Sequence, residues 1–135
     1  MRGNTVPKFS EKSKNKLSTC DERLIEILDE VIKEYDCTIL EGHRSIERQA
    51  ELYASGRSRV KLGKHNAYPS LAVDVAPYPV DWENRERFIS FGSFLKGVAH
   101  SKGIEIRWGA DWNSNWNFED QHFDDLVHFE LIVEE

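Results

Sequence analysis

The chain has 135 residues, of which 39% are hydrophobic, and this length and composition suit one compact domain over residues 1–135. The charged residues, 31% of the total, are mixed along the chain rather than gathered in blocks, which argues against intrinsic disorder. The net charge of -6 argues against a nucleic-acid-binding protein, because neutralising phosphates requires a cluster of Lys and Arg.

The first segment of the chain, residues 1–17, is polar and contains Pro7. We expect an irregular or weakly helical lead-in there. The segment has no apolar stretch long enough for a signal peptide or a membrane helix. A soluble protein made in the cytoplasm, with no membrane segment, is therefore the expectation.

The first clear helical pattern covers residues 18–35, where an N-cap and acidic residues precede apolar residues at helical spacing. Cys20 and Cys37 are separated by a helix-like segment and lack CxxC spacing. This arrangement favours two free buried thiols over a redox motif or a thiolate zinc site.

Two further helices and four short strands are predicted from apolar periodicity and from Gly and Pro residues at their ends. The strand in the middle of the chain is an apolar run bounded by Pro69 and Pro77, and Gly103 ends the last helix. The helices are expected over residues 46–55 and 83–101, and the strands over residues 37–40, 71–76, 104–108 and 127–133.

Residues 109–125 show no clear period and are rich in Trp, Asn and Asp, which is typical of a long functional loop. Trp108 is predicted to be a core residue. For Trp112 and Trp116 a glycan-stacking surface is the alternative to the core. The basic stretch over residues 57–64 is interpreted as a solvated loop, with an anion-binding surface as the alternative.

Asp74 is the single charged residue of the apolar run over residues 71–76. A carboxylate there needs a cation, a metal or hydrogen-bond donors. His128 in the last strand and His65 in a loop are uninformative when each is taken alone. Together, two His and one Asp supply the three protein ligands of an open zinc site that leaves the fourth position to water. The sequence therefore predicts a Zn²⁺ site at His65, Asp74 and His128.

Two further residues fit the chemistry of such a site. A zinc-activated water needs a proton acceptor, and Asp125, three residues before His128, is suited to general-base work. Arg44 follows a strand and Gly42, and its guanidinium is suited to stabilising an oxyanion. The other histidines considered as ligands, none of which displaces the chosen set, are His43, His100 and His122.

Four segments between Leu40 and Leu131 form a larger pattern in which order and spacing carry more weight than any single motif. These segments are Glu41-Gly42-His43-Arg44-Ser45 with Gln49, His65 followed by Ala72-Val73-Asp74-Val75, Trp108-Gly109-Ala110-Asp111-Trp112, and Asp125-Leu126-Val127-His128-Phe129-Glu130-Leu131.

In these segments the chain resembles the D-alanyl-D-alanine carboxypeptidase and L-alanyl-D-glutamate endopeptidase family. This family comprises the VanY-like and phage-endolysin metallopeptidases, which share a zinc fold with lysostaphin and hedgehog. The resemblance implies that His65, Asp74 and His128 bind zinc. It also implies that Asp125 is the catalytic base and that Arg44 binds or polarises the substrate carbonyl.

The chain departs from the family pattern at two places. Gly63 stands two residues before the first ligand, where the family usually has Ser. Eight residues, 66–73, separate His65 from Asp74, where the family usually has six. A loop before the strand can absorb the extra length, so His65 is kept as a ligand. Glu130 is expected to orient a ligand or to face solvent.

For architecture we expect an α+β fold in which an antiparallel sheet of about four strands carries the metal on one face and packs against helices on the other. The resemblance implies a peptidase acting on the stem peptide of bacterial peptidoglycan. The leading hypothesis is a monomeric phage endolysin that cuts the L-alanyl-D-glutamate bond, made in the host cytoplasm and reaching the periplasm at lysis.

Two alternatives remain open at the level of sequence. One is a D-alanyl-D-alanine carboxypeptidase or dipeptidase with the same metal site. The other is a non-catalytic zinc-containing domain that binds peptidoglycan, which the presence of both Asp125 and Arg44 disfavours. Secondary calcium binding by the acidic residues Asp120, Asp124 and Asp125 is a further open possibility.

Overall fold

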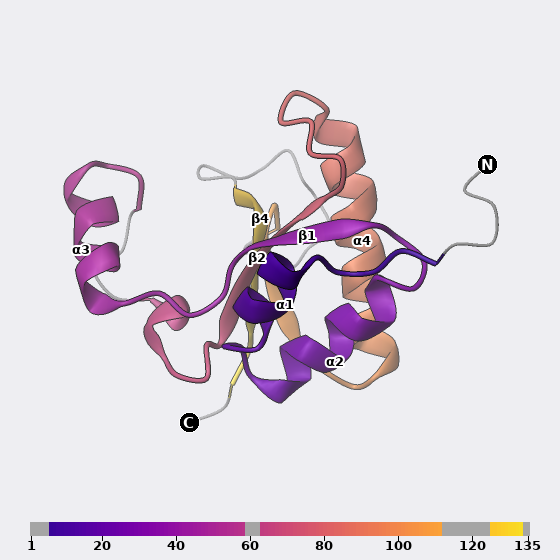
Figure 1. Ribbon diagram of the computed structural model, residues 1–135, viewed down its shortest axis with the longest axis horizontal. Helices are drawn as coiled ribbons and strands as arrows, with labels where there is room; N and C mark the ends of the chain where they lie inside the picture. The colour runs from indigo at the N-terminus through magenta and orange to yellow at the C-terminus, as the bar shows by residue number, and fades with distance from the viewer. Residues whose placement is uncertain (1–5, 59–62, 112–124, 134–135) are drawn as a thin grey trace.

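The computed structural model describes residues 6–58, 63–111 and 125–133. These residues form a small α+β fold around one sheet, as the sequence predicted (Figure 1). The helices are α1 (Glu11–Leu17), α2 (Glu22–Val31), α3 (Ile46–Ala54) and α4 (Arg85–Ser101), with a 3-10 turn η1 (Lys64–Asn66), and the strands are β1 (Cys37–Glu41), β2 (Ala72–Pro77), β3 (Ile106–Gly109) and β4 (Asp125–Leu131).

The four strands form a sheet in the order β1-β2-β4-β3, and each strand is antiparallel to its neighbours. The last strand of the sequence therefore lies inside the sheet, between β2 and β3. Asp74 on β2 pairs with His128 on β4 in this register. Side chains of directly paired residues lie on the same face of a sheet, so this register alone brings two of the predicted ligands together.

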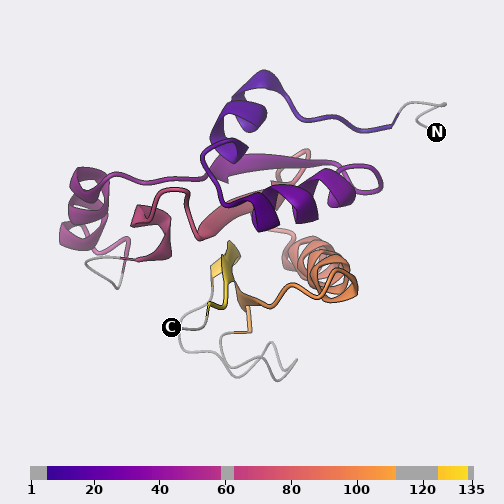
Figure 2. The same ribbon diagram turned by 90° about the horizontal axis from the view of Figure 1, so that it is seen from below.

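One face of the sheet packs against helices and the other carries polar side chains. In β4, Phe129 and Leu131 are fully buried in the core, whereas His128 and Glu130 alternate with them and point to the opposite face. Helix α4 packs along β2, β3 and β4, and α2 packs against α4. Helix α3 and η1 lie together beyond one end of the sheet in both views (Figures 1 and 2).

Of the expected irregular or weakly helical lead-in over residues 1–17, the described residues 6–10 form no helix or strand and α1 begins at Glu11. The Ser10 hydroxyl caps this helix by accepting a hydrogen bond from the Ser13 amide, at 3.1 Å. Ser13 is buried and its hydroxyl accepts the backbone N–H of Ile39, at 3.0 Å. The helix is thus fixed to β1 by polar contacts, which a search for apolar periodicity does not detect.

The prediction of two free buried cysteines is confirmed, whereas the first predicted helix, residues 18–35, is shorter at both ends because α2 covers Glu22–Val31. Cys20 and Cys37 are buried free thiols, and burial raises their pKa values to about 11 and about 12. Gly56 and Gly103, each just beyond a helix, have φ of 78° and 72°. Within the described ranges, no helix is both long enough and apolar enough to cross a membrane.

Trp108 is the large core residue that joins β3 to α4. It is fully buried, its ring stacks on Phe129 at a centroid distance of 5.6 Å, and its other surroundings include Gly92 of α4. A Cβ atom on Gly92 would lie 2.0 Å from Cζ2 of Trp108. The close approach of α4 to the sheet therefore requires glycine at this position.

We predict that Gly92→Ala lowers the free energy of unfolding by about 1–3 kcal/mol, the usual penalty for overpacking a core. Gly97→Ala is the matched control, because Gly97 lies on the same helix and a Cβ there meets nothing within 4 Å. This control should be neutral or stabilising by up to about 1 kcal/mol. Urea unfolding of the three proteins measures the difference, and equal stabilities would refute the packing argument.

Candidate active site

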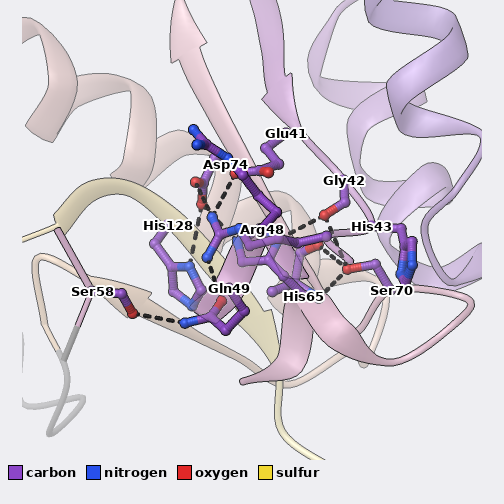
Figure 3. A network of polar contacts seen from close by, with 12 residues as sticks. Glu41, Gly42, His43, Arg48, Gln49, Ser58, His65, Ser70, Asp74 and His128 are labelled. Carbon is purple, nitrogen blue, oxygen red and sulfur yellow. Dashed lines mark hydrogen bonds and ion pairs between the residues drawn. The ribbon is translucent and has the colours of Figure 1, made fainter. Parts of the chain in front are cut away.

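Three segments far apart in the sequence meet at the polar face of the sheet (Figure 3). Asp74 Oδ1 lies 3.0 Å from His65 Nε2 and 3.2 Å from His128 Nδ1. Asp74 and His128 come from neighbouring strands, and His65 comes from η1. The structure thus brings together the three residues predicted as metal ligands.

The orientation of His65 is set by the backbone of Gly42. The Gly42 carbonyl can only accept a hydrogen bond, so His65 Nδ1, at 2.7 Å, carries the hydrogen and Nε2 faces Asp74. Gly42 itself packs tightly, since a Cβ there would lie 2.4 Å from the Lys16 carbonyl oxygen at the end of α1. The eight residues between His65 and Asp74 are accommodated in η1 and the turn before β2.

The orientation of His128 is set by Glu130, two residues further along the same face of β4. Glu130 Oε1 lies 2.9 Å from His128 Nε2, which leaves Nδ1 to face Asp74. The other carboxylate oxygen of Glu130 pairs with Lys64 Nζ at 3.1 Å. Glu130 therefore orients a candidate ligand, one of the two roles expected for it. Lys64 joins the turn that carries His65 to the strand that carries His128.

The donor atoms of His65, Asp74 and His128 all lie within 4.8 Å of one another. Tetrahedral ligands at zinc distances of about 2.0–2.1 Å stand roughly 3.3 Å apart, close to the two N–O separations here. In each imidazole one ring nitrogen is hydrogen-bonded to a carbonyl or carboxylate of the protein, and the other ring nitrogen faces Asp74. Metal-ligating histidines have this arrangement. The three residues thus form a possible metal-binding group of two nitrogens and one oxygen.

The protonation of this cluster follows from its hydrogen bonds. Burial alone would raise the pKa of Asp74, but the hydrogen bonds from His128 and His65 outweigh it and hold that pKa well below its usual range. Burial alone would lower the pKa of His128, but Asp74 and Glu130 raise it to about 9. In Glu130 the bonds from His128 and Lys64 outweigh burial and lower the pKa to about 2.

Asp125 is the first residue of β4 and lines the same cavity as the three candidate ligands. The sequence placed it in a loop before the strand, but β4 begins two residues earlier than predicted and Asp125 pairs with Gly109 of β3. A Cβ on Gly109 would lie 2.1 Å from the Asp125 carbonyl oxygen, so glycine permits this close pairing. Burial raises the pKa of Asp125, and the negative charge of Asp74 raises it further.

Arg44 lies between β1 and α3 with its guanidinium held on two sides. It donates to Glu41 Oε1 at 2.5 Å and to Gln49 Oε1 at 2.9 Å, and lies 3.6 Å from Asp74 Oδ2. Gln49 is fully buried and donates in turn to Ser58 at 2.9 Å. Among buried side-chain polar atoms of the described residues, Arg44 Nε is the one without a hydrogen-bond partner.

Sequence reasoning matched Glu41 and Gln49 to the family pattern but gave neither residue a role. Glu41 lies three residues before Arg44 and Gln49 lies five residues after it. This short separation was the available signal that they contact Arg44, because a charged side chain that is buried needs partners nearby. Lys64 was interpreted only as part of a solvated basic stretch. Its contact with Glu130 depends on the packing of η1 against β4, which the sequence does not reveal.

The candidate residues line one cavity of about 530 Å³ on the polar side of the sheet. Helix α3 contributes Arg48 and Leu52 to its wall, and β3 contributes Arg107. The remaining lining residues are Glu41, Arg44, Arg57, Ser58, Gly63, Lys64, His65, Asp74, Asp125, His128 and Glu130.

The other histidines do not belong to the group. His43 is drawn apart from Asp74 in Figure 3; its Nδ1 lies 3.0 Å from the Ala67 carbonyl oxygen and its ring contacts Tyr68. His100 is exposed on α4. The predictions for Trp112, Trp116, Asp120, His122 and Asp124 lie outside the described residues.

Comparison with known proteins identifies the family to which this chain belongs. The family model described as phage L-alanyl-D-glutamate peptidase matches residues 5–132. The L-alanyl-D-glutamate peptidase of Escherichia phage T5 is 30% identical over 120 residues, which are 84% of this chain and 88% of the T5 protein. The protein is therefore an enzyme, a peptidase of the peptidoglycan-hydrolase class. It belongs to the phage L-alanyl-D-glutamate peptidase family.

A solved structure shows the same fold. The L-Ala D-Glu endopeptidase ChiX of Serratia marcescens superimposes with a TM-score of 0.76, covering 98% of this chain and 96% of that one, at 22% sequence identity. The fold is thus shared with a bacterial protein of low sequence identity.

The pKa of His128 leads to a prediction for the protein freed of metal by a chelator. Because the folded pKa, about 9, exceeds the ordinary 6.5, the protonated imidazole stabilises the fold fully below pH 6.5. That stabilisation is lost as the pH rises through about 9. We therefore expect the Tm of the chelated protein to fall between pH 6.5 and pH 9.5.

Differential scanning fluorimetry across this pH range measures the effect, and NMR titration of the His128 ring assigns it. The His128→Gln variant is the control, since without the imidazole the decline over this range should flatten. A Tm of the chelated wild-type protein that stays constant from pH 6.5 to pH 9.5 would contradict the proposed His128–Asp74–Glu130 coupling.

Proposed function

We propose that this protein is a zinc-dependent endopeptidase that hydrolyses the L-alanyl-D-glutamate bond in the stem peptide of bacterial peptidoglycan. The observation that carries the proposal is the convergence of His65, Asp74 and His128 on the wall of a cavity that also contains Asp125 and Arg44. Membership of the phage L-alanyl-D-glutamate peptidase family supports the choice of bond.

The metal proposed for the site is Zn²⁺, with His65 Nε2, His128 Nδ1 and Asp74 as its ligands. Two imidazoles and one carboxylate are a typical donor set for catalytic zinc, in which a fourth position stays open. When bound, zinc supplies Lewis-acid polarisation of the scissile carbonyl and makes water a better nucleophile near neutral pH. Glu130 and Gly42 keep the two imidazoles in the tautomers that metal binding requires.

Asp125 is proposed as the general base. It lies in the same cavity as the ligands without belonging to the ligand group, so its carboxylate is available for proton transfer. Its raised pKa brings it closer to the working pH, where a base both accepts and releases a proton efficiently. Asp125 would take the proton from the attacking water and pass it to the leaving amine.

Arg44 is proposed to stabilise the negative charge that develops on the scissile carbonyl oxygen. Glu41 and Gln49 fix the guanidinium beside Asp74, so little reorganisation is needed during the reaction. The Nε–H without a partner shows that the hydrogen-bonding capacity of this guanidinium is not used up within the described part of the chain.

The phage relationship supports a role in host lysis. We propose that the protein is a monomeric endolysin that accumulates in the host cytoplasm and reaches the cell wall from the periplasm at lysis. Size-exclusion chromatography with light scattering tests the monomer.

The proposed activity predicts that the zinc-loaded protein releases peptides with a new N-terminal D-glutamate from purified peptidoglycan. Mass spectrometry of the digest identifies the bond. A chelator should abolish release and added Zn²⁺ should restore it. Release of D-alanine instead would indicate a carboxypeptidase, and zinc binding without any product would indicate a non-catalytic peptidoglycan-binding domain.

A second prediction concerns Asp125. The Asp125→Asn variant should bind one equivalent of zinc like the wild type but lose turnover by on the order of 10²–10⁴-fold, the usual contribution of a general base. Asp29→Asn is the matched control, an exposed acid on α2 outside the cavity, and should leave kcat unchanged. Wild-type turnover by Asp125→Asn at full zinc occupancy would remove Asp125 from the mechanism.

A further inference from the structure

The cavity is rich in positive charge although the chain as a whole carries a net charge of -6. Five cationic side chains line it, together with four carboxylates. The cationic residues are Arg44, Arg48, Arg57, Lys64 and Arg107, and the acidic residues are Glu41, Asp74, Asp125 and Glu130.

Four of the five cationic residues have partners or lie on the exposed rim. Arg44 pairs with Glu41, and Lys64 pairs with Glu130. Arg48 is exposed and lies 3.6 Å from Glu51 of its own helix. Arg57 is also exposed, and its Nε donates to the Ser55 hydroxyl at 3.0 Å.

Arg107 is different from these four, because it is half-buried and fixed on a strand of the sheet. Its partner in the β3–β4 register is Glu130, so the two side chains share the polar face. Both oxygens of Glu130 are already engaged, Oε1 by His128 and Oε2 by Lys64. In the described part of the chain, Arg107 makes no ion pair within 4.0 Å.

The position of Arg107 relative to the proposed zinc site follows from the strand order β1-β2-β4-β3. Asp74 and His128 lie on the two inner strands, Arg44 follows the outer strand β1, and Arg107 lies on the outer strand β3. Diagonal neighbours across an antiparallel pair are about 7–8 Å apart, which is the relation of Arg107 to His128. Arg107 is therefore beside the reaction centre without being a ligand.

The proposed substrate carries a free carboxylate close to the bond that is cut. A glutamyl residue joined through its amino group to alanine has two carboxyl groups, of which one continues the peptide and the other stays free. This free carboxylate is only a few bonds from the scissile amide. A guanidinium binds a carboxylate through two parallel hydrogen bonds, and partial burial strengthens them.

We propose that Arg107 is a specificity-determining residue that binds the free carboxylate of the glutamyl residue on the leaving side of the scissile bond. This inference rests on the proposed peptidase function. Arg44 then contacts the carbonyl that is attacked, and Arg107 binds the substrate carboxylate. Within the described residues Arg107 makes no ion pair, so the substrate carboxylate would supply its counter-ion.

The test compares two synthetic stem peptides that differ in one group. One peptide has the free carboxylate of the glutamyl residue, and the other has an uncharged carboxamide of the same shape in its place. We expect the wild-type kcat/KM to favour the carboxylate by on the order of tenfold to a hundredfold, the range for a hydrogen bond to a charged group. In Arg107→Gln this preference should disappear, through loss of turnover of the carboxylate peptide alone. Arg107→Lys should recover part of it.

Lys33→Gln is the matched control, since Lys33 is an exposed cation just beyond the end of α2, outside the cavity lining, that pairs with Glu30. It should keep the wild-type preference. A wild-type enzyme that cleaves both peptides equally, or an Arg107→Gln variant that keeps the preference, would overturn the role of Arg107 while leaving the peptidase function intact. Cleavage of neither peptide by the zinc-loaded wild type would instead refute the proposed function. If Arg107→Gln fails to fold, equal cleavage of the two peptides by the wild type, or an undiminished preference in Arg107→Lys, still overturns the role of Arg107.

Discussion

The structure of the site depends on one partly buried carboxylate, that of Asp74. Asp74 lies in a strand whose neighbours Val73 and Val75 are in the core, where an unpaired charge would be strongly destabilising. Three cationic or hydrogen-bonding groups meet it, from η1, from β4 and from the segment after β1. The strand order that places β4 beside β2 is therefore also the order that neutralises Asp74, so fold and site are stabilised by the same contacts.

Backbone packing fixes the side chains around Asp74. The Gly42 carbonyl holds His65, and Gly42 must be glycine because α1 lies against it. Gly109 in the same way lets β3 approach the backbone of Asp125 at the start of β4. Neither glycine takes part in chemistry. Both allow a close approach that a Cβ would prevent, and this approach determines where the histidine and the acid point.

Much of the site could be predicted from the sequence because its central residues are chemically unusual for their surroundings. A single carboxylate in an apolar run requires an explanation, and together with the two histidines it indicates a metal site. The residues around them gave weaker signals. Glu130, Lys64 and Gln49 are ordinary polar residues whose partners lie two, sixty-six and five positions away in sequence, so their roles emerge only when η1, α3 and β4 are packed together. The sequence indicated no more than a weakly helical lead-in where α1 lies for a related reason, since polar contacts of Ser10 and Ser13 hold this helix.

The two outer strands place two different arginine environments on opposite sides of the cavity. On the β1 side, Arg44 is held by Glu41 and Gln49 and is rigid before substrate arrives. On the β3 side, Arg107 faces a carboxylate whose oxygens are committed to His128 and Lys64. A rigid, paired guanidinium suits the stabilisation of transient charge, because it need not move during the reaction. An unpaired guanidinium suits the recognition of a permanent charge, because the difference between bound and free states is then largest. Among the residues that the structure describes, commitment of Glu130 to His128 therefore leaves Arg107 without a carboxylate partner, and one carboxylate links the proposed metal centre to the proposed substrate selection.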